Sequence, residues 1–523
     1  MRFLKILLTS AGIAGLLGAT VLSPDFVLKH LSSDGIVTAE GYEAIKQLRL
    51  FAFLLGSLLT AAGSLFFIFP ERARNLLKRP AGAVLMLIIG WLVMAFVNYL
   101  MKKMGMSIGT PDLFPFSELD GPRIHIAGLP FSVMFLAVLF LSIKYSGDFN
   151  VFQIWIIGLS LILLGNLAQG GVEEAFYKPI SAPFYYLNMP HYQQYYHDAV
   201  KITDWHEWLR SFNLQQAHLL SHTRTHPPFA VLLHYFFIRL FHGNLMFIAG
   251  SFIFLSSISM ILIYQIMKGL DLPKQQSAQF ALLFSVVPAY NIYSAVSLDG
   301  VVISFCTLFL SGVIMMVKNR RGLSGVLFFI SGLLLMNILT FTGFFMVAAS
   351  GIIALRELFI NRKLNVLLAL AILLLIMLMT HVCMKTYFGY DHIQAFLTAV
   401  HLEPESLFNP IAYIMTRLEN LTMLLIFLSF GITAVLLRPE YLGLRIFDLR
   451  DNINAIFVAG ILPLLLFLLI GGLYTGEIAR IFLFIYPFFL LVLRNVGEST
   501  LRFLLVAAGV QTVIMQTIGG YFW

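Results

Sequence analysis

Two adjacent carboxylates are candidates for acid–base chemistry. Glu173 and Glu174 stand in the stretch GGVEEAFY, directly after an apolar segment. A carboxylate there could act as a general base that takes a proton from a hydroxyl or an amine, if burial raises its pKa. Asp198 and Asp204, in the later stretch YYHDAVKITD, could take the same role. A solvated helix end is the alternative interpretation of the glutamate pair.

The stretch LLSHTRTHPPFAVLLHY gathers His222, Arg224 and His226 just ahead of a second apolar segment. Two histidines four residues apart could bind a metal on a helix. Pro227 disfavours a helix at His226, and no third ligand is near, so we expect no metal or other cofactor. Arg224 is suited to a phosphate because guanidinium binds phosphate oxygens bidentately. A cationic His/Arg cluster therefore predicts an anionic lipid headgroup, and a solvated loop is the alternative.

Three further charged residues stand at the ends of apolar segments. Asp299 lies in the short stretch YSAVSLDG, and Glu477 and Arg480 lie in YTGEIARIFLFIYP. Glu477 and Arg480 are three apart and could pair across one helical turn. Ionisable groups in such places are costly, so each is a candidate for substrate binding.

Composition identifies the elements that must position these residues. Of 523 residues, 59% are hydrophobic and only 11% are charged, whereas soluble domains carry about 25% charged residues. Apolar runs of transmembrane length predict an all-α polytopic bundle, because lipid cannot satisfy backbone polar groups and no barrel pattern is present. The formal charge of +8 comes from basic clusters between apolar segments. That pattern reports membrane topology and argues against nucleic-acid binding.

We expect about fifteen spans, of which the first is an uncleaved helix. An N-terminal bundle at 1–150 precedes a catalytic membrane domain at 151–500 and a final helix at 501–523. The spans are placed near 5–23, 50–69, 82–101, 127–144, 151–168, 244–267, 278–296, 300–317, 323–340, 342–357, 364–385, 418–437, 453–473, 480–493 and 501–520.

The basic clusters also predict orientation. Clusters at 71–79, 318–321, 356–363 and 438–450 should face the cytoplasm. Alternating the spans between them places the long loop 169–243 on the outer face, together with Asp299 and Arg480. Within that loop, 227–243 is short and apolar and begins with prolines, so it predicts a helix that lies along the membrane surface.

The ordered set EEAFY, HTRTHPP, SLDG and GEIARIFLFIYP resembles the GT-C superfamily over roughly residues 150 to 500. These are polytopic glycosyltransferases that use polyprenyl-phosphate sugars, such as the protein mannosyltransferases and the aminoarabinose lipid A transferase. EEAFY is similar to the acidic motif of their first outer loop, and THPP to a motif that opens a juxtamembrane helix. Here the acidic stretch follows about the fifth span and reads Glu-Glu where Asp is common, so the identity of the base stays open.

The resemblance implies an inverting, integral-membrane glycosyltransferase whose donor is a polyprenyl-phosphate sugar. It also implies membrane lipids as partners. It further implies the bacterial inner membrane, with the active site on the extracytoplasmic face. Two alternatives remain from the sequence. One is a transporter or flippase for a lipid-linked glycan, which the absence of a sequence repeat disfavours. The other is a glycan ligase or polymerase with a polyprenyl-diphosphate donor.

Overall fold

The chain is helical throughout the part that the computed structural model describes, and no strand occurs in that part. The described residues are 2–21, 39–68, 80–103, 124–181, 195–320, 322–402, 410–438, 442, 448–470 and 478–521. Six of the helical segments are long and apolar enough to cross a membrane. These are Ile126–Tyr145 (η1 and α6), Leu245–Gly269 (α13), Leu298–Val317 (α16), Gly322–Leu339 (α17), Asn365–Phe388 (α19) and Glu498–Ile518 (α27). The protein is therefore an integral membrane protein.

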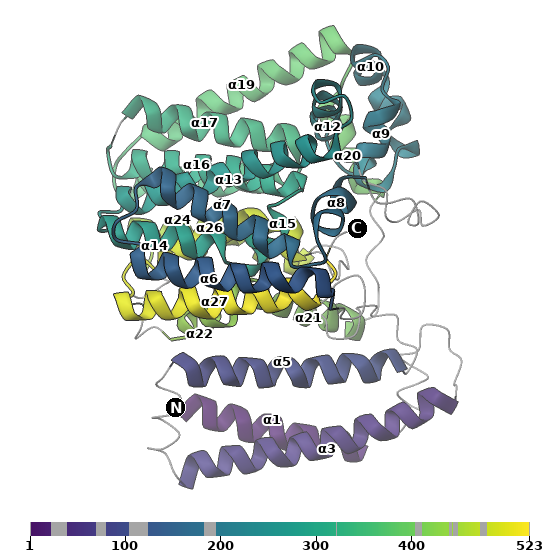
Figure 1. The fold of residues 1–523 in the computed structure, drawn as a ribbon, viewed down its shortest axis with the longest axis vertical. Coiled ribbons are helices and arrows are strands. Elements are labelled where there is room, and N and C mark those ends of the chain that lie inside the picture. The colour runs from purple at the N-terminus through teal and green to yellow at the C-terminus, as the bar shows by residue number, and fades with distance from the viewer. Residues whose placement is uncertain are drawn as a thin grey trace.

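Three N-terminal helices lie together on one side of the molecule (Figure 1). They are α1 (Arg2–Val21), α3 (Ala39–Ile68) and α5 (Pro80–Lys103). Helix α1 packs so closely along α3 that a Cβ atom on Gly12 would lie 2.7 Å from the backbone nitrogen of Thr60. Small residues allow this approach of two helices in lipid.

The remaining helices form a bundle in which α6, α7 (Val151–Leu167), α13, α16 and α27 run side by side (Figure 1). Short helices gather at one end of it, which we call the loop end. They are α8 (Lys178–Ser181), α9 (Tyr195–Lys201), α10 (Trp205–Gln215), α11 (Ser221–Arg224), α12 (Pro228–Leu240) and α20 (His392–Leu402). The helix predicted at 227–243 is α12, and Pro228 occupies its first turn.

Three of the predicted continuous spans are wrong, because the chain breaks within each. The segment 278–296 divides into α14 (Lys274–Ser285) and α15 (Pro288–Tyr293), at Pro288. The segment 418–437 divides into α21 (Pro410–Leu428) and α22 (Phe430–Leu436), where Ser429 adopts a φ of 100°. The segment 480–493 divides into α25 (Ile478–Ile481), the short η6 (Leu483–Ile485) and α26 (Tyr486–Val492). Apolar periodicity alone does not reveal such breaks.

Polar side chains of α27 bind the backbone groups that two of these breaks expose. Gln511 accepts the N–H of Phe430 at 2.8 Å and donates to the carbonyl of Ile426 at 2.7 Å, so it bridges the α21–α22 break. Thr512 donates to the carbonyl of Val286 at 2.7 Å, at the end of α14. All of these groups are buried. Irregular backbone in a membrane domain is tolerated where protein satisfies it in this way.

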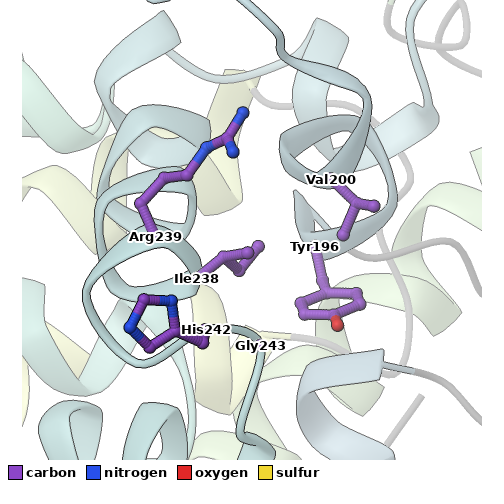
Figure 2. A pocket seen from close by; sticks show the side chains of 6 residues that line it. All are labelled: Tyr196, Val200, Ile238, Arg239, His242 and Gly243. Carbon is purple, nitrogen blue, oxygen red and sulfur yellow. The ribbon is translucent and has the colours of Figure 1, made fainter.

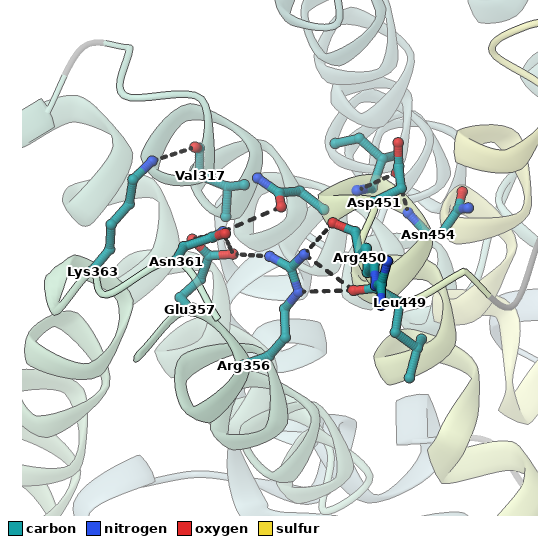
Figure 3. Close-up of polar contacts among 11 residues, drawn as sticks. Val317, Arg356, Glu357, Asn361, Lys363, Leu449, Arg450, Asp451 and Asn454 are labelled. Atoms are coloured by element: carbon teal, nitrogen blue, oxygen red, sulfur yellow. Dashed lines mark hydrogen bonds and ion pairs between the residues drawn. The ribbon is translucent and has the colours of Figure 1, made fainter. Parts of the chain in front are cut away.

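A second polar cluster, whose contacts are drawn in Figure 3, lies just before the start of α19. The other end of α19 meets the loop end, where Phe388 stacks on Trp205, so the cluster lies at the opposite end of the bundle. Arg356, in α18 (Gly343–Phe359), pairs with Glu357 at 2.6 Å and donates to the carbonyls of Leu449 and Arg450. Asn361 donates to both carboxylate oxygens of the buried Glu357. The cluster therefore holds α18 against the segment that leads into α24 (Asn452–Ile470).

Arg320, from a basic cluster predicted to face the cytoplasm, also lies at this opposite end. It follows the C-terminus of α16 and pairs with Asp271 at 2.5 Å. The cluster at 71–79 and Arg321 lie outside the described residues. The segment 182–194 of the long loop lies outside them as well.

Candidate functional site

The acidic stretch EEAFY forms a π-helix, Glu173–Tyr177, at the loop end. The N–H of Lys178 donates to the carbonyl of Glu173, five residues back, which is the defining bond of such a turn. π-Helical turns are rare and occur frequently at functional sites. Glu173 is exposed and Glu174 is partly buried, so both carboxylates face the surface of this end.

Two glycines make room for the π-helix. Gly170 and Gly171 have φ values of 136° and 105°, which side-chain-bearing residues rarely adopt. A Cβ on Gly170 would lie 2.9 Å from Cγ of Glu174 and 3.1 Å from Cγ of His125. Glu174 also forms an ion pair with Lys178, one turn along. The side chain of Glu174 is therefore held in place, whereas that of Glu173 reaches solvent.

The two aspartates of the following stretch have local structural partners. Asp198 is 4% exposed, accepts the N–H of Leu220 at 3.1 Å, and lies 3.2 Å from Nζ of Lys201. Asp204 caps α10 by accepting the N–H groups of His206 and Glu207. Asp198 thus fixes the start of α11, and Asp204 fixes the start of α10.

The histidine cluster is built on α11 and the turn that follows it. Nδ1 of His226 lies 3.0 Å from the carbonyl of His222, so that nitrogen donates its hydrogen and Nε2 is the nitrogen left for other contacts. The ring of Tyr195 lies 5.8 Å from that of His222 and 5.3 Å from that of His226. It also lies 5.3 Å from the ring of His234, in α12. The buried tyrosine therefore packs the three imidazoles together.

Burial makes the first two of these histidines weak bases. Burial, with the positive charge of Arg480 and with His226, lowers the pKa of His222 well below its usual value. Burial and, to a lesser extent, the charge of Arg480 lower the pKa of His226 to about 4, although the hydrogen bond to the carbonyl of His222 raises it. Both imidazoles are neutral at pH 7. The prediction of a cationic His/Arg cluster is therefore wrong for the histidines, and the arginines supply the positive charge.

Arg480 reaches this cluster from the C-terminal part of the chain. It lies in α25, and its Nε is 3.7 Å from Oδ2 of Asp299, in the first turn of α16. The two side chains are 14% and 27% exposed, respectively. The charge of Arg480 acts on His222 and His226, so Arg480, with Asp299 beside it, lies near these histidines. Glu477, the other predicted partner of Arg480, lies outside the described residues.

Arg224 stands between the two histidines in the sequence, at the end of α11. Its carbonyl accepts a hydrogen bond from the side chain of Gln216 at 2.9 Å, which anchors the backbone of α11. Its Nε is buried and has no hydrogen-bond partner among the described residues. A buried donor without a partner is costly, so an acceptor atom of a ligand would stabilise this guanidinium.

Sequence reasoning missed three residues of this site, Lys178, Tyr195 and His125. Lys178 stands four residues after Glu174, a spacing at which opposite charges meet on a helix, so their pair was predictable. Tyr195 is one of several tyrosines in the stretch HYQQYYHDAV, and no spacing distinguishes it from the others.

The candidate residues form two groups at the loop end. Glu174 lies with Lys178 and His125, and Arg480 and Asp299 lie near His222 and His226 of the segment that also holds Arg224. Among the described residues, no three His, Cys, Asp or Glu side chains gather closely enough to hold a metal ion. Comparison of the chain with protein-family models, with curated proteins and with solved structures finds no match.

Proposed function

We propose that the protein is an integral-membrane glycosyltransferase that moves a sugar from a polyprenyl-phosphate donor to an acceptor outside the cytoplasm. One observation carries the proposal: Arg480, paired with Asp299, meets the His222–His226 segment from a distant part of the chain. The acidic π-helix lies at the same end of the bundle. The loop end thus has carboxylates that could remove a proton from the acceptor and a guanidinium group that could bind the leaving phosphate.

In this proposal Arg224 and Arg480 bind the phosphate of the donor and stabilise its charge as it departs. Glu173 or Glu174 takes the proton of the acceptor hydroxyl or amine, whose oxygen or nitrogen attacks the anomeric carbon of the sugar. The bond from that carbon to the phosphate oxygen breaks, so the configuration inverts and polyprenyl phosphate leaves. The GT-C-like fold and the location in a bacterial inner membrane belong to the same proposal.

The neutral histidines fit a supporting role. A neutral imidazole adds no charge, so the affinity for phosphate would come from the two arginines. The donor phosphate is a diester with one negative charge, and its binding would raise the pKa of His222 and His226 by favouring their protonated forms. Donor binding is then coupled to proton uptake at these residues.

Transport of a lipid-linked glycan is the second candidate, because discontinuous helices are typical of transporters. The breaks between α14 and α15 and between α21 and α22 match that feature. However, Gln511 and Thr512 of α27 bind the backbone groups that these breaks expose, so those groups are not available to a substrate or ion. The charged candidates lie at the loop end instead. A ligase with a diphosphate donor would use the same arginines.

The purified protein in proteoliposomes tests these functions. A panel of radiolabelled polyprenyl-phosphate and polyprenyl-diphosphate sugars is supplied with envelope lipids and glycans as acceptors. We expect label to move from a monophosphate donor to an acceptor, with release of polyprenyl phosphate. Consumption of diphosphate donors alone would assign the ligase reaction. Movement of intact donor across the vesicle membrane, without transfer, would assign transport and reject the proposal.

A further inference from the structure

A separate pocket of about 280 Å³ lies between α9 and the C-terminal end of α12 (Figure 2). Its lining consists of Tyr196, Val200, Ile238, Arg239, His242 and Gly243. None of the residues assigned to the transfer reaction lines it. Its volume is near the lower limit for small-molecule sites, about 300 Å³, and is enough for one small polar group.

The lining is suited to an anion. Arg239 and His242 supply nitrogen donors, Tyr196 supplies a hydroxyl, and the described residues that line the pocket include no carboxylate. In Figure 2, Arg239 and His242 project from one wall, and Tyr196 and Val200 form the other. An arginine fork with a histidine beside it matches the oxygens of a phosphate group.

Arg239 is held in place before any ligand binds. Its Nη2 donates to the carbonyl of Ile202 at 3.2 Å, and its guanidinium carbon lies 5.2 Å from the centre of the Tyr235 ring. Guanidinium has five N–H donors, so this single bond leaves others for a ligand. Because the side chain is already ordered, binding costs less conformational entropy.

His242 stands in a conformation that favours glycine. Its φ is 51°, and the next residue, Gly243, has a φ of 77° and donates to the carbonyl of Ile238 at 2.9 Å. This six-to-one bond caps the end of α12, and glycine is the usual residue at the position His242 occupies. A strained residue that faces a pocket indicates a function for its side chain.

Exposed apolar side chains lie close in the chain to the residues that line the pocket. Phe236 precedes Arg239 by three residues, so the two share one face of α12, and Leu240 adjoins them. The side chains of Phe236 and Leu240 are more than half exposed, as are those of Val200 and Phe247. Apolar groups beside an arginine and a histidine match a lipid, with acyl chains along α12 and a headgroup in the pocket. A free anion would gain nothing from this apolar surface.

We propose that the pocket binds the headgroup phosphate of an anionic membrane lipid, with Arg239 and His242 as its ligands. The site is independent of the proposed glycosyl transfer, because it shares no residue with it. The rival explanation is that Arg239 only stabilises the C-terminus of α12 and its contact with Ile202.

Thermal unfolding of the purified full-length protein in a non-ionic detergent tests this site. Phosphatidylglycerol, phosphatidylcholine and inorganic phosphate are each titrated, because a ligand of the folded state raises Tm in proportion to its binding. We expect phosphatidylglycerol to raise Tm far more than the other two. Arg239→Gln and His242→Gly should each weaken its apparent affinity about tenfold or more. Arg210→Gln, an exposed arginine of α10 at the same end, is the matched control.

His242→Gly separates binding from folding. Glycine relieves the left-handed conformation, so Tm without lipid should stay the same or rise while lipid binding falls. Unchanged phosphatidylglycerol affinity in both Arg239→Gln and His242→Gly would overturn the proposal. Stabilisation of the wild type by inorganic phosphate alone, to the same extent, would overturn the assignment to a lipid.

Discussion

Oδ2 of Asp299 and Nε of Arg480 lie 3.7 Å apart at the loop end of the bundle, although one opens α16 and the other belongs to α25. The pair holds a positive charge beside His222 and His226, and the pKa values of both histidines respond to it. Asp299 thus orients Arg480 toward α11.

Arg480→Lys should reduce turnover of the polyprenyl-phosphate donor by about tenfold or more, although the charge is unchanged. Lysine cannot present the planar fork that binds two phosphate oxygens at once. Initial rates across donor concentrations would show a higher KM and a lower kcat. Arg502 is an exposed arginine near the N-terminus of α27 that pairs with Glu498. Arg502→Lys should leave both parameters unchanged. Equal rates for Arg480→Lys and the wild type would remove Arg480 from the reaction.

Acidification should destabilise the protein through His226. Its pKa is about 4 in the folded chain and about 6.5 when unfolded. Between these values the unfolded chain binds a proton that the folded chain does not, so stability falls as pH falls from 6.5 to 4. The loss approaches about 1.4 kcal/mol per pH unit in that window.

Tm measured from pH 7 to 4.5 checks this prediction. His226→Asn keeps a nitrogen near the carbonyl of His222 and removes the titration, so Tm should fall less steeply with acid. His218→Asn changes an exposed histidine and should leave the slope as it is. An identical slope in His226→Asn and the wild type would contradict the assignment.

Glutamine at the true base should lower turnover by about 100-fold or more, because it retains size and hydrogen bonding but cannot accept the proton. Glu173→Gln and Glu174→Gln are compared by single-turnover transfer assays. Lys178→Met is the control for Glu174, since it removes the ion pair and leaves the carboxylate. Normal turnover in both single variants and in the double variant would place the base elsewhere.

The helical bundle was predictable from composition, because twenty-residue apolar runs have few other solutions in lipid. The break before α15 has a sequence signal in Pro288, because proline interrupts helices. The break at Ser429 has no such signal, and the backbone groups beside it are bound by Gln511 of a helix far along the chain. A continuous apolar pattern is compatible with both an unbroken span and a broken one.

The candidate site was predictable as a set of residues at one end of the bundle. The partner of Arg480 was not, because the pair with Asp299 joins two distant segments and no spacing records it. The neutral state of the histidines was also missed, since it follows from burial and from the nearby guanidinium. Asp198 and Asp204 were predicted as possible bases, because the sequence does not show from which backbone N–H groups a carboxylate accepts hydrogen bonds.

Thr512→Val should destabilise the protein by about 1 kcal/mol, because the carbonyl of Val286 loses its partner inside the bundle. Valine has nearly the same shape, so packing is preserved. Thr386→Val is the matched control, since that hydroxyl bonds only to the carbonyl of Val382 in its own helix, and its effect should stay within about 0.5 kcal/mol. Reversible unfolding in mixed micelles measures both. Equal effects would mean that α27 does not stabilise the broken helices.

A structure of the full chain in a lipid nanodisc with bound polyprenyl phosphate tests the central claim most directly. The measured quantities are the distances from the phosphate oxygens to the guanidinium nitrogens of Arg224 and Arg480. We predict that both arginines donate hydrogen bonds of about 3 Å to one phosphate, with Asp299 still beside Arg480. A phosphate bound elsewhere, or guanidinium groups more than about 15 Å apart and so beyond shared hydrogen bonding, would contradict the proposed donor site.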